Sequence, residues 1–190
     1  MTTSNPSSAH EEWAKHMRTF IRGDCAVTNY WDEIEENRAP IFTSRNDEGI
    51  VAATIGLMDF NQSLYTESEI FSEIIMDQRG HDECIGNILS TIAFYVMNDN
   101  WKVAPGVIFE SMVEMYIPET KLPHVMFVAP FQWRNMSKIV LTDKTIYPLV
   151  AVPISEAEKQ VARTNQGQDL EELWSRLNVD VLNWKRHSAA

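Results

Sequence analysis

The stretch IFTSRNDEGIVAATIGL, residues 41–57, decides the fold class of this 190-residue chain. Residues 41–44 and 50–57 are two runs rich in β-branched and apolar side chains, which favour strands. The polar segment between them, residues 46–49, ends in glycine, as tight turns often do. The sequence therefore predicts two antiparallel strands joined by a short turn. A third strand, rich in Ile and Phe, is predicted over residues 69–77 in the same sheet.

A helix is predicted next, over residues 83–97, with Asp82 as its N-cap. Its apolar residues recur with the helical period of three or four positions: Ile85, Ile88, Leu89, Ile92 and Val96. We expect this apolar face to pack on the sheet. Further strands are expected at residues 107–116, 125–129, 146–152 and 179–182.

Two more helical regions lie nearer the ends of the sequence. Ser8 with Glu11 predicts a capping box at the start of a first helix, and Gly23 is expected to end that helix. Ser155 and Glu158 form a second capping-box pattern directly after Pro153. A last helix is predicted from the apolar periodicity that closes the chain, with Asn178 at its end: Leu170, Leu173, Trp174 and Leu177.

Helices and strands are thus mixed without the strict alternation of a doubly wound sheet, which favours the α+β class. We expect a single-domain α/β sandwich with a mixed, largely antiparallel sheet and helices packed on it. Residues 1–8 are small and polar and are expected to form a flexible tail, and residues 9–190 are expected to form the domain. The length fits one domain.

The balance of charged residues excludes some classes of function. Lys and Arg number 16 against 27 Asp and Glu, a formal net charge of −11. This argues against a nucleic-acid binder and against docking to an anionic membrane, both of which use basic surfaces. Residues 1–8 lack the basic and apolar segments typical of an export signal, so we expect none, and no apolar run is long enough to span a membrane. A cytoplasmic location is therefore expected, with Cys25 and Cys84 as reduced thiols.

Motifs for enzymatic chemistry are missing from the sequence. It contains no GxGxxG, no GxxxxGK[ST], no GxSxG and no CxxC pattern. His10 and His16 are six positions apart, whereas a zinc-binding helix places its histidines four apart. The segment 81–84 gathers His, Asp, Glu and Cys, and is interpreted as a polar loop. We therefore predict no catalytic residues, no metal site and no cofactor.

An acidic run is the strongest candidate for a binding surface: Asp32, Glu33, Glu35 and Glu36. It is either a solvated face or a docking surface for a basic protein. Neighbouring carboxylates repel one another, and nothing local in the sequence requires these four. We therefore expect the run to contribute to partner binding, with Tyr30 or Trp31 as an aromatic anchor.

The order and spacing of many short matches make the chain resemble the Suppressor of fused domain family over residues 41–186. The residues that carry this resemblance, in chain order, are IFTSR at 41–45, GI at 49–50, ATIGL at 53–57, EII at 73–75, IAFYV at 92–96, PG at 105–106, IF at 108–109, LPH at 122–124, MF at 126–127, PFxW at 130–133, VPIS at 152–155 with Glu158, Gly167, Leu170, Leu173, Leu177 and VLNWxR at 181–186.

This resemblance implies an α/β sandwich and a non-enzymatic role in binding other proteins. Animal members restrain a transcription factor and carry a second domain, so that function is not carried over to this chain. Many stand-alone bacterial members are immunity proteins that neutralise a polymorphic toxin, so the resemblance implies a toxin domain as the partner. The acidic charge of this chain is compatible with a basic toxin domain. The family-motif residues are expected to serve the backbone geometry and packing: Gly56, Pro105, Gly106, Pro130, Trp133, Pro153 and Arg186.

Two other functions stay open at this point. One is an enzyme that uses acidic residues and His124 in a pocket. The other is a regulatory adaptor without a toxin partner. Trp133 and Arg186 likewise have two readings, because each could pack on the fold or face a partner.

Overall fold

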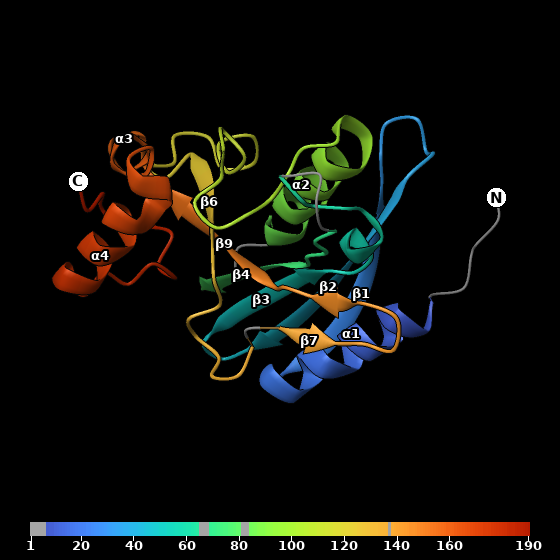
Figure 1. Ribbon diagram of the computed structural model, residues 1–190. Helices are drawn as coiled ribbons and strands as arrows, with labels where there is room; N and C mark the ends of the chain where they lie inside the picture. The colour runs from blue at the N-terminus through green and yellow to red at the C-terminus, as the bar shows by residue number, and fades with distance from the viewer. Residues whose placement is uncertain (1–6, 65–68, 81–83, 137) are drawn as a thin grey trace.

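A seven-stranded sheet in the order β1-β2-β3-β4-β9-β6-β5 runs through the molecule. The computed structural model describes residues 7–64, 69–80, 84–136 and 138–190 (Figure 1). The strands of the sheet are β1 (Asp24–Trp31), β2 (Arg38–Asn46), β3 (Gly49–Thr54), β4 (Ile74–Arg79), β5 (Ile108–Phe109), β6 (His124–Val128) and β9 (Leu149–Ile154). Neighbouring strands are antiparallel except β4 and β9, which are parallel. The predicted α+β class with a mixed, largely antiparallel sheet is confirmed.

Helices cover both faces of this sheet. Figure 1 shows α1 (Ser8–Phe20) on one side and α2 (Ile85–Asp99) on the other, with α3 (Glu156–Ala162) and α4 (Gln168–Leu177) beyond one end of the sheet. A separate ribbon, β7 (Ile139–Val140) with β8 (Thr145–Ile146), lies beside α1. Side chains of alternate strand residues point to opposite faces. Ile75 accordingly packs in the core that contains Trp13 of α1, whereas Ile74 and Met76 pack in the core of α2.

The predicted hairpin at residues 41–57 is confirmed as β2 and β3. The side chain of Asn46 closes its turn, because Asn46 Oδ1 accepts hydrogen bonds from Glu48 N at 2.8 Å and Gly49 N at 3.0 Å. A Cβ at Gly49 would lie 2.0 Å from the carbonyl oxygen of Gln78, so β3 and β4 approach too closely there for any side chain. β3 ends at Thr54, before the predicted Leu57, which instead begins the short 3-10 helix η1 (Leu57–Asp59).

The predicted central helix is confirmed as α2, and its apolar residues are all buried: Ile85, Ile88, Leu89, Ile92 and Val96. The expected cap, Asp82, lies outside the described residues. The capping box of Ser155 and Glu158 is confirmed at α3. Asn178 ends α4 as predicted, in the left-handed conformation at φ 51°.

At the first helix both predicted capping residues are wrong, each by one or two positions. Ser7, not Ser8, is the N-cap of α1, and its hydroxyl accepts from His10 N at 3.3 Å. Ile21 caps the other end, whereas Gly23 adopts φ 141° and begins the turn into β1. A Cβ at Gly23 would lie 2.1 Å from the carbonyl oxygen of Arg45, so glycine is required for contact with β2.

Several strand predictions are wrong. The strand predicted over residues 107–116 is only β5, because turns follow Phe109 and Ser111 takes a positive φ angle. Residues 179–182 form no strand, and a turn lies at residues 181–182. The third strand begins at Ile74, five residues later than predicted. The long strand β1 was missed altogether. Among the residues that the structure describes, no helix combines the length and the apolar composition of a membrane span.

Candidate functional site

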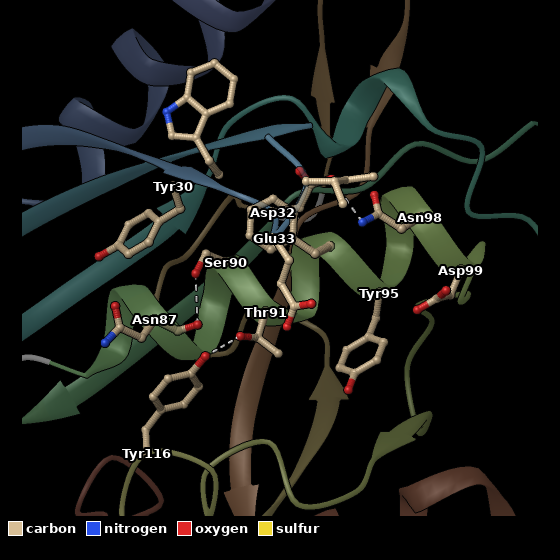
Figure 2. Close-up of a pocket in the computed structure, with 13 residues that line it drawn as sticks. Tyr30, Asp32, Glu33, Asn87, Ser90, Thr91, Tyr95, Asn98, Asp99 and Tyr116 are labelled. Carbon is tan, nitrogen blue, oxygen red and sulfur yellow. Dashed lines mark hydrogen bonds between the residues drawn. The ribbon is translucent and has the colours of Figure 1, made fainter. Parts of the chain in front are cut away.

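A groove of about 680 Å³ separates the end of β1 and its following turn from the outer face of α2 (Figure 2). Its walls are aromatic and its charged groups are acidic. The residues that give it this character are Tyr30, Glu33, Phe94, Tyr95, Asp99 and Tyr116. None of the described residues that line the groove is Lys or Arg. The groove is therefore a negatively charged, aromatic surface.

The aromatic side chains are held in place by their neighbours. Gly86 allows β1 to pack closely on α2, since a Cβ at that position would lie 2.3 Å from the Tyr30 hydroxyl oxygen. Burial raises the pKa of the Tyr30 hydroxyl. Tyr116 shares a hydrogen bond of 2.5 Å with Thr91 of α2. Tyr95 stacks on Trp101, with ring centroids 4.4 Å apart. Such fixed rings lose little entropy when a partner binds.

Asp32 organises the turn at the rim of the groove. Its Oδ1 accepts from Glu36 N at 2.9 Å, and its Oδ2 accepts from Asn37 N at 3.2 Å. Asn98 of α2 donates to the same Oδ2 at 3.2 Å and so ties the turn to the helix. Burial alone would raise the pKa of Asp32, but hydrogen bonds from Asn37, Asn98 and Glu36 outweigh burial and lower it. The expectation that Asp32 has no local structural role is therefore wrong.

The other acidic residues of the turn face solvent. Glu33, Glu35 and Glu36 are exposed, and no ion pair is found for them within the described residues. Figure 2 shows the Glu33 side chain extending over α2. Trp31 precedes the turn and is 51% exposed. The structure thus brings Tyr30, Asp32 and Glu33 to one groove, with Glu35 and Glu36 on the turn beside it.

The family-motif residues lie elsewhere, most of them in backbone or packing positions. Gly56 and Gly106 have φ angles of 108° and 80°. Pro105 and Pro130 line a separate apolar cavity of about 640 Å³. Trp133 is half-buried and lines a small cavity beside Asp77. None of these residues lines the acidic groove.

Arg186 and Pro153 take part in one buried polar cluster around Glu158. Arg186 Nη1 and Nη2 donate to the two Glu158 carboxylate oxygens at 2.6 and 3.0 Å. Nη2 also donates to the carbonyl oxygen of Pro153 at 3.0 Å, and Trp174 Nε1 donates to Glu158 at 3.1 Å. Burial would raise the pKa of Glu158, but these hydrogen bonds and the Arg186 charge lower it. The cluster fastens the segment after α4 to β9 and α3.

His124 has both ring nitrogens engaged. Its Nδ1 accepts from Ser111 N at 3.0 Å, and its Nε2 lies 2.8 Å from Glu156 Oε2. The ring is buried and is not part of the acidic groove. An imidazole with its hydrogen on Nε2 donates to Glu156 and accepts at Nδ1, so it satisfies both contacts. These contacts hold the loop at Ser111 and the start of α3 against β6.

Most of the α2 side of the groove was missed from the sequence. Tyr95, Asn98 and Asp99 lie on the outer face of α2, which was interpreted only through its buried face, and α2 extends two residues beyond the predicted end at residue 97. Asn98 and Asp32 are 66 positions apart. The signal in the sequence that could have indicated this binding surface was the presence of tyrosine and asparagine on the solvent-facing side of α2.

Comparisons with known proteins agree on one family. A model of the family described as Suppressor of fused protein (SUFU) matches residues 40–187. The chain is 34% identical to "Immunity protein YqcF" of Bacillus subtilis (strain 168) over 171 residues, which are 87% of this chain and 89% of that protein.

Solved structures show the same fold at low identity. A SUFU homologue from Neisseria gonorrhoeae FA 1090 superposes with a TM-score of 0.78 at 15% identity, covering 96% of this chain and 97% of that one. Drosophila Suppressor of Fused superposes with a TM-score of 0.56 at 16% identity, over 87% of this chain and 42% of that protein.

Proposed function

This chain belongs to the Suppressor of fused protein family, and from that premise we propose that it is an immunity protein, which neutralises a toxin by binding it without catalysis. The relative with the name "Immunity protein YqcF" supports this role, because the match extends over nearly all of both chains. The partner would be a basic toxin domain, and this chain would bind it in the cytoplasm of the cell that produces this chain. The bound surface would centre on the acidic groove.

The observation that carries this proposal is the charge of the groove. Glu33 and Asp99 line it, Glu35 and Glu36 lie beside it, and no described lining residue is basic. A concentrated negative surface accelerates encounter with a positive partner and discriminates against other proteins. The rigid rings of Tyr30, Tyr95 and Tyr116 add the aromatic contacts that dominate binding at many interfaces.

The same charge explains how binding would inhibit. A toxin that acts on an anionic substrate presents basic residues where the substrate binds. An acidic protein docked on those residues excludes the substrate by occupying its place. No chemical step by the immunity protein is then needed.

Co-expression with a toxin tests this proposal. The probe is the protein encoded immediately upstream of the gene for this chain, which the proposal takes to be the toxin, expressed in Escherichia coli with and without the wild-type chain. We expect growth to be restored by the chain, and the purified proteins to form a complex by calorimetry. Absence of both rescue and binding would overturn the proposed function.

A matched pair of variants tests the site. E33Q/E35Q/E36Q removes three exposed charges at the groove and should slow association at low salt and flatten its salt dependence. The control D47N/D143N/E172Q removes three exposed charges outside it. Equal association rates for the two variants would place the bound surface elsewhere.

A further inference from the structure

The outer edge of strand β1 is free of any paired strand among residues 7–64, 69–80, 84–136 and 138–190. Within these residues β1 is the outermost strand of the sheet, and it pairs with β2 from Asp24 opposite Arg45 to Trp31 opposite Arg38. This register is continuous over eight residue pairs and has no bulge. The strand at the other edge of the sheet, β5, has only two residues. β1 is therefore the longer of the two edges.

Two contacts show which backbone groups of β1 point outward. Asp32 N donates to Asn37 O, so the pair that follows Trp31 and Arg38 is hydrogen-bonded. In an antiparallel ladder, hydrogen-bonded and non-hydrogen-bonded pairs alternate. Asn29 and Pro40 then form a non-hydrogen-bonded pair, which agrees with the missing N–H of proline and with the bond from Ile55 N to Pro40 O. The outward N–H and C=O groups belong to Cys25, Val27, Asn29 and Trp31.

These outward groups are unprotected. No described residue is found to hydrogen-bond with them across the edge. Edge strands are usually shielded by Lys, Pro, a bulge or a covering loop, but β1 contains no Lys and no Pro. Val27 and Trp31 are 53% and 51% exposed. An eight-residue edge in this state is a template for strand pairing.

We propose that an extended segment of the toxin pairs with the free edge of β1 and adds an eighth strand to the sheet. This inference rests on the proposed function and specifies how the partner is held. Trp31 is the last residue of β1 and directly precedes the acidic turn, so a strand on β1 leads to Glu33, Glu35 and Glu36. The segment therefore carries Lys or Arg at the end that lies beside Trp31.

The charge favours such a partner over a second copy of this chain. Each copy carries a net charge of −11. In a symmetric antiparallel pair of β1 strands, Asp24 of each copy would lie near the acidic turn of the other. Like charges in that arrangement oppose pairing.

A side-chain pocket lies on the same edge. A cavity of about 370 Å³ between α1 and β1 is lined by apolar residues that include Ala14, Val27 and Phe42, and by charged side chains of α1. Side chains of an added strand alternate between the two faces. One apolar side chain of the toxin segment would fill this cavity while the backbone groups pair.

Amide hydrogen exchange tests the proposal residue by residue, using the full chain and the upstream-encoded protein that the proposed function takes to be the toxin. In the free chain, the amides of Ala26, Thr28 and Tyr30 should exchange slowly because β2 protects them. Those of Cys25, Val27, Asn29 and Trp31 should exchange rapidly. In the complex, these four should be protected by about tenfold or more.

A proline variant provides the second test. Asn29→Pro removes an outward N–H and leaves the ladder with β2 intact, and Val27→Pro does the same if the first variant folds poorly. Asn29→Ala is the control that keeps the N–H. The proline variant should bind the toxin domain about tenfold more weakly, and the alanine variant within about twofold of the wild type.

The outcomes separate the two proposals. If the wild-type chain does not bind the toxin domain, the proposed function fails and this inference fails with it. If it binds but the four amides stay unprotected, or Asn29→Pro binds as tightly as Asn29→Ala, only strand pairing is overturned. Protection that rises with the concentration of the chain alone would show self-pairing and would also overturn the inference.

Discussion

Two carboxylate-rich regions of the molecule use their charge in opposite ways. Around Glu158, a fully buried carboxylate is paired with Arg186 through two hydrogen bonds. At the turn after β1, Asp32 is hydrogen-bonded internally, whereas Glu33, Glu35 and Glu36 are exposed without an ion pair among the described residues. The comparison shows that the carboxylates with a structural role, Glu158 and Asp32, have hydrogen-bond partners within the fold. Charges left unpaired are available to a partner.

The largest effect is expected at the buried pair. Arg186→Met leaves Glu158 as an uncompensated buried charge, and should lower the free energy of unfolding by about 3–5 kcal/mol. Urea denaturation measures this loss. The double variant Glu158→Gln with Arg186→Met should recover part of it, since no charge is then buried. A loss below about 1 kcal/mol would show that the pair contributes little.

A buried carboxylate without a cation sharpens the comparison. Glu73 is fully buried, and burial raises its pKa to about 8 although hydrogen bonds from Thr54, Met58 N and Gly56 N oppose the shift. The folded chain therefore holds this proton more tightly than the unfolded chain, whose ordinary value is 4.5. The contribution of Glu73 to stability is full below about pH 4.5 and is lost as the pH rises toward 8.

The variant Glu73→Gln isolates this contribution. Gly56 N and Met58 N both donate to Oε1, so the amide oxygen of glutamine keeps both bonds while its nitrogen donates to the Thr54 hydroxyl. The free energy of unfolding of the wild type should therefore fall relative to the variant between pH 4.5 and 8. Asp77, whose pKa burial raises to about 6, contributes equally to both proteins. Parallel curves across this window would contradict the buried, protonated state.

A smaller loss of stability is expected at the rim of the groove. Asp32→Ala removes the acceptor for Glu36 N, Asn37 N and the Asn98 amide. Loss of a partly buried acceptor should cost about 1–3 kcal/mol. Thermal unfolding measures the loss, and amide exchange at residues 33–37 should rise more than exchange in α2. Unchanged exchange in the turn would mean that Asp32 does not hold it.

The smallest effect on stability should follow removal of the unpaired charges. E33Q/E35Q/E36Q relieves repulsion between exposed carboxylates, so its free energy of unfolding should stay within about 0.5 kcal/mol of the wild type. Urea denaturation at low and high salt measures this. A loss above about 1 kcal/mol would show that the fold needs these charges, and would remove the contrast with Glu158.

The parts predicted correctly from the sequence have local causes. The β2–β3 turn depends on Asn46 and Gly49, and the start of α3 depends on Ser155 and Glu158. The helix α2 is predicted by the helical period of its apolar residues. Each signal lies within a few residues along the chain. Such signals need no knowledge of the tertiary structure.

The parts that were missed depend on contacts between distant residues. β1 lacks alternation of apolar and polar residues because it is an edge strand exposed along most of its length. The predicted strand at 107–116 fails because turns follow Phe109 and Ser111 adopts a positive φ angle, which serine as a residue type does not predict. The groove needs Asn98 beside Asp32, and Glu73 is buried only because the backbone N–H groups around η1 close over it.

The pairing of Glu158 with Arg186 has a consequence for synthesis of the chain on the ribosome. Glu158 emerges 28 residues before its cation. A nascent chain that has released α3 but not residue 186 holds a carboxylate that its core cannot bury without cost. Closure of that core therefore waits for the segment after α4. A chain that stops between Glu158 and Arg186 lacks this cation, so its α3 would pack poorly on β9 and leave that strand more accessible to proteases.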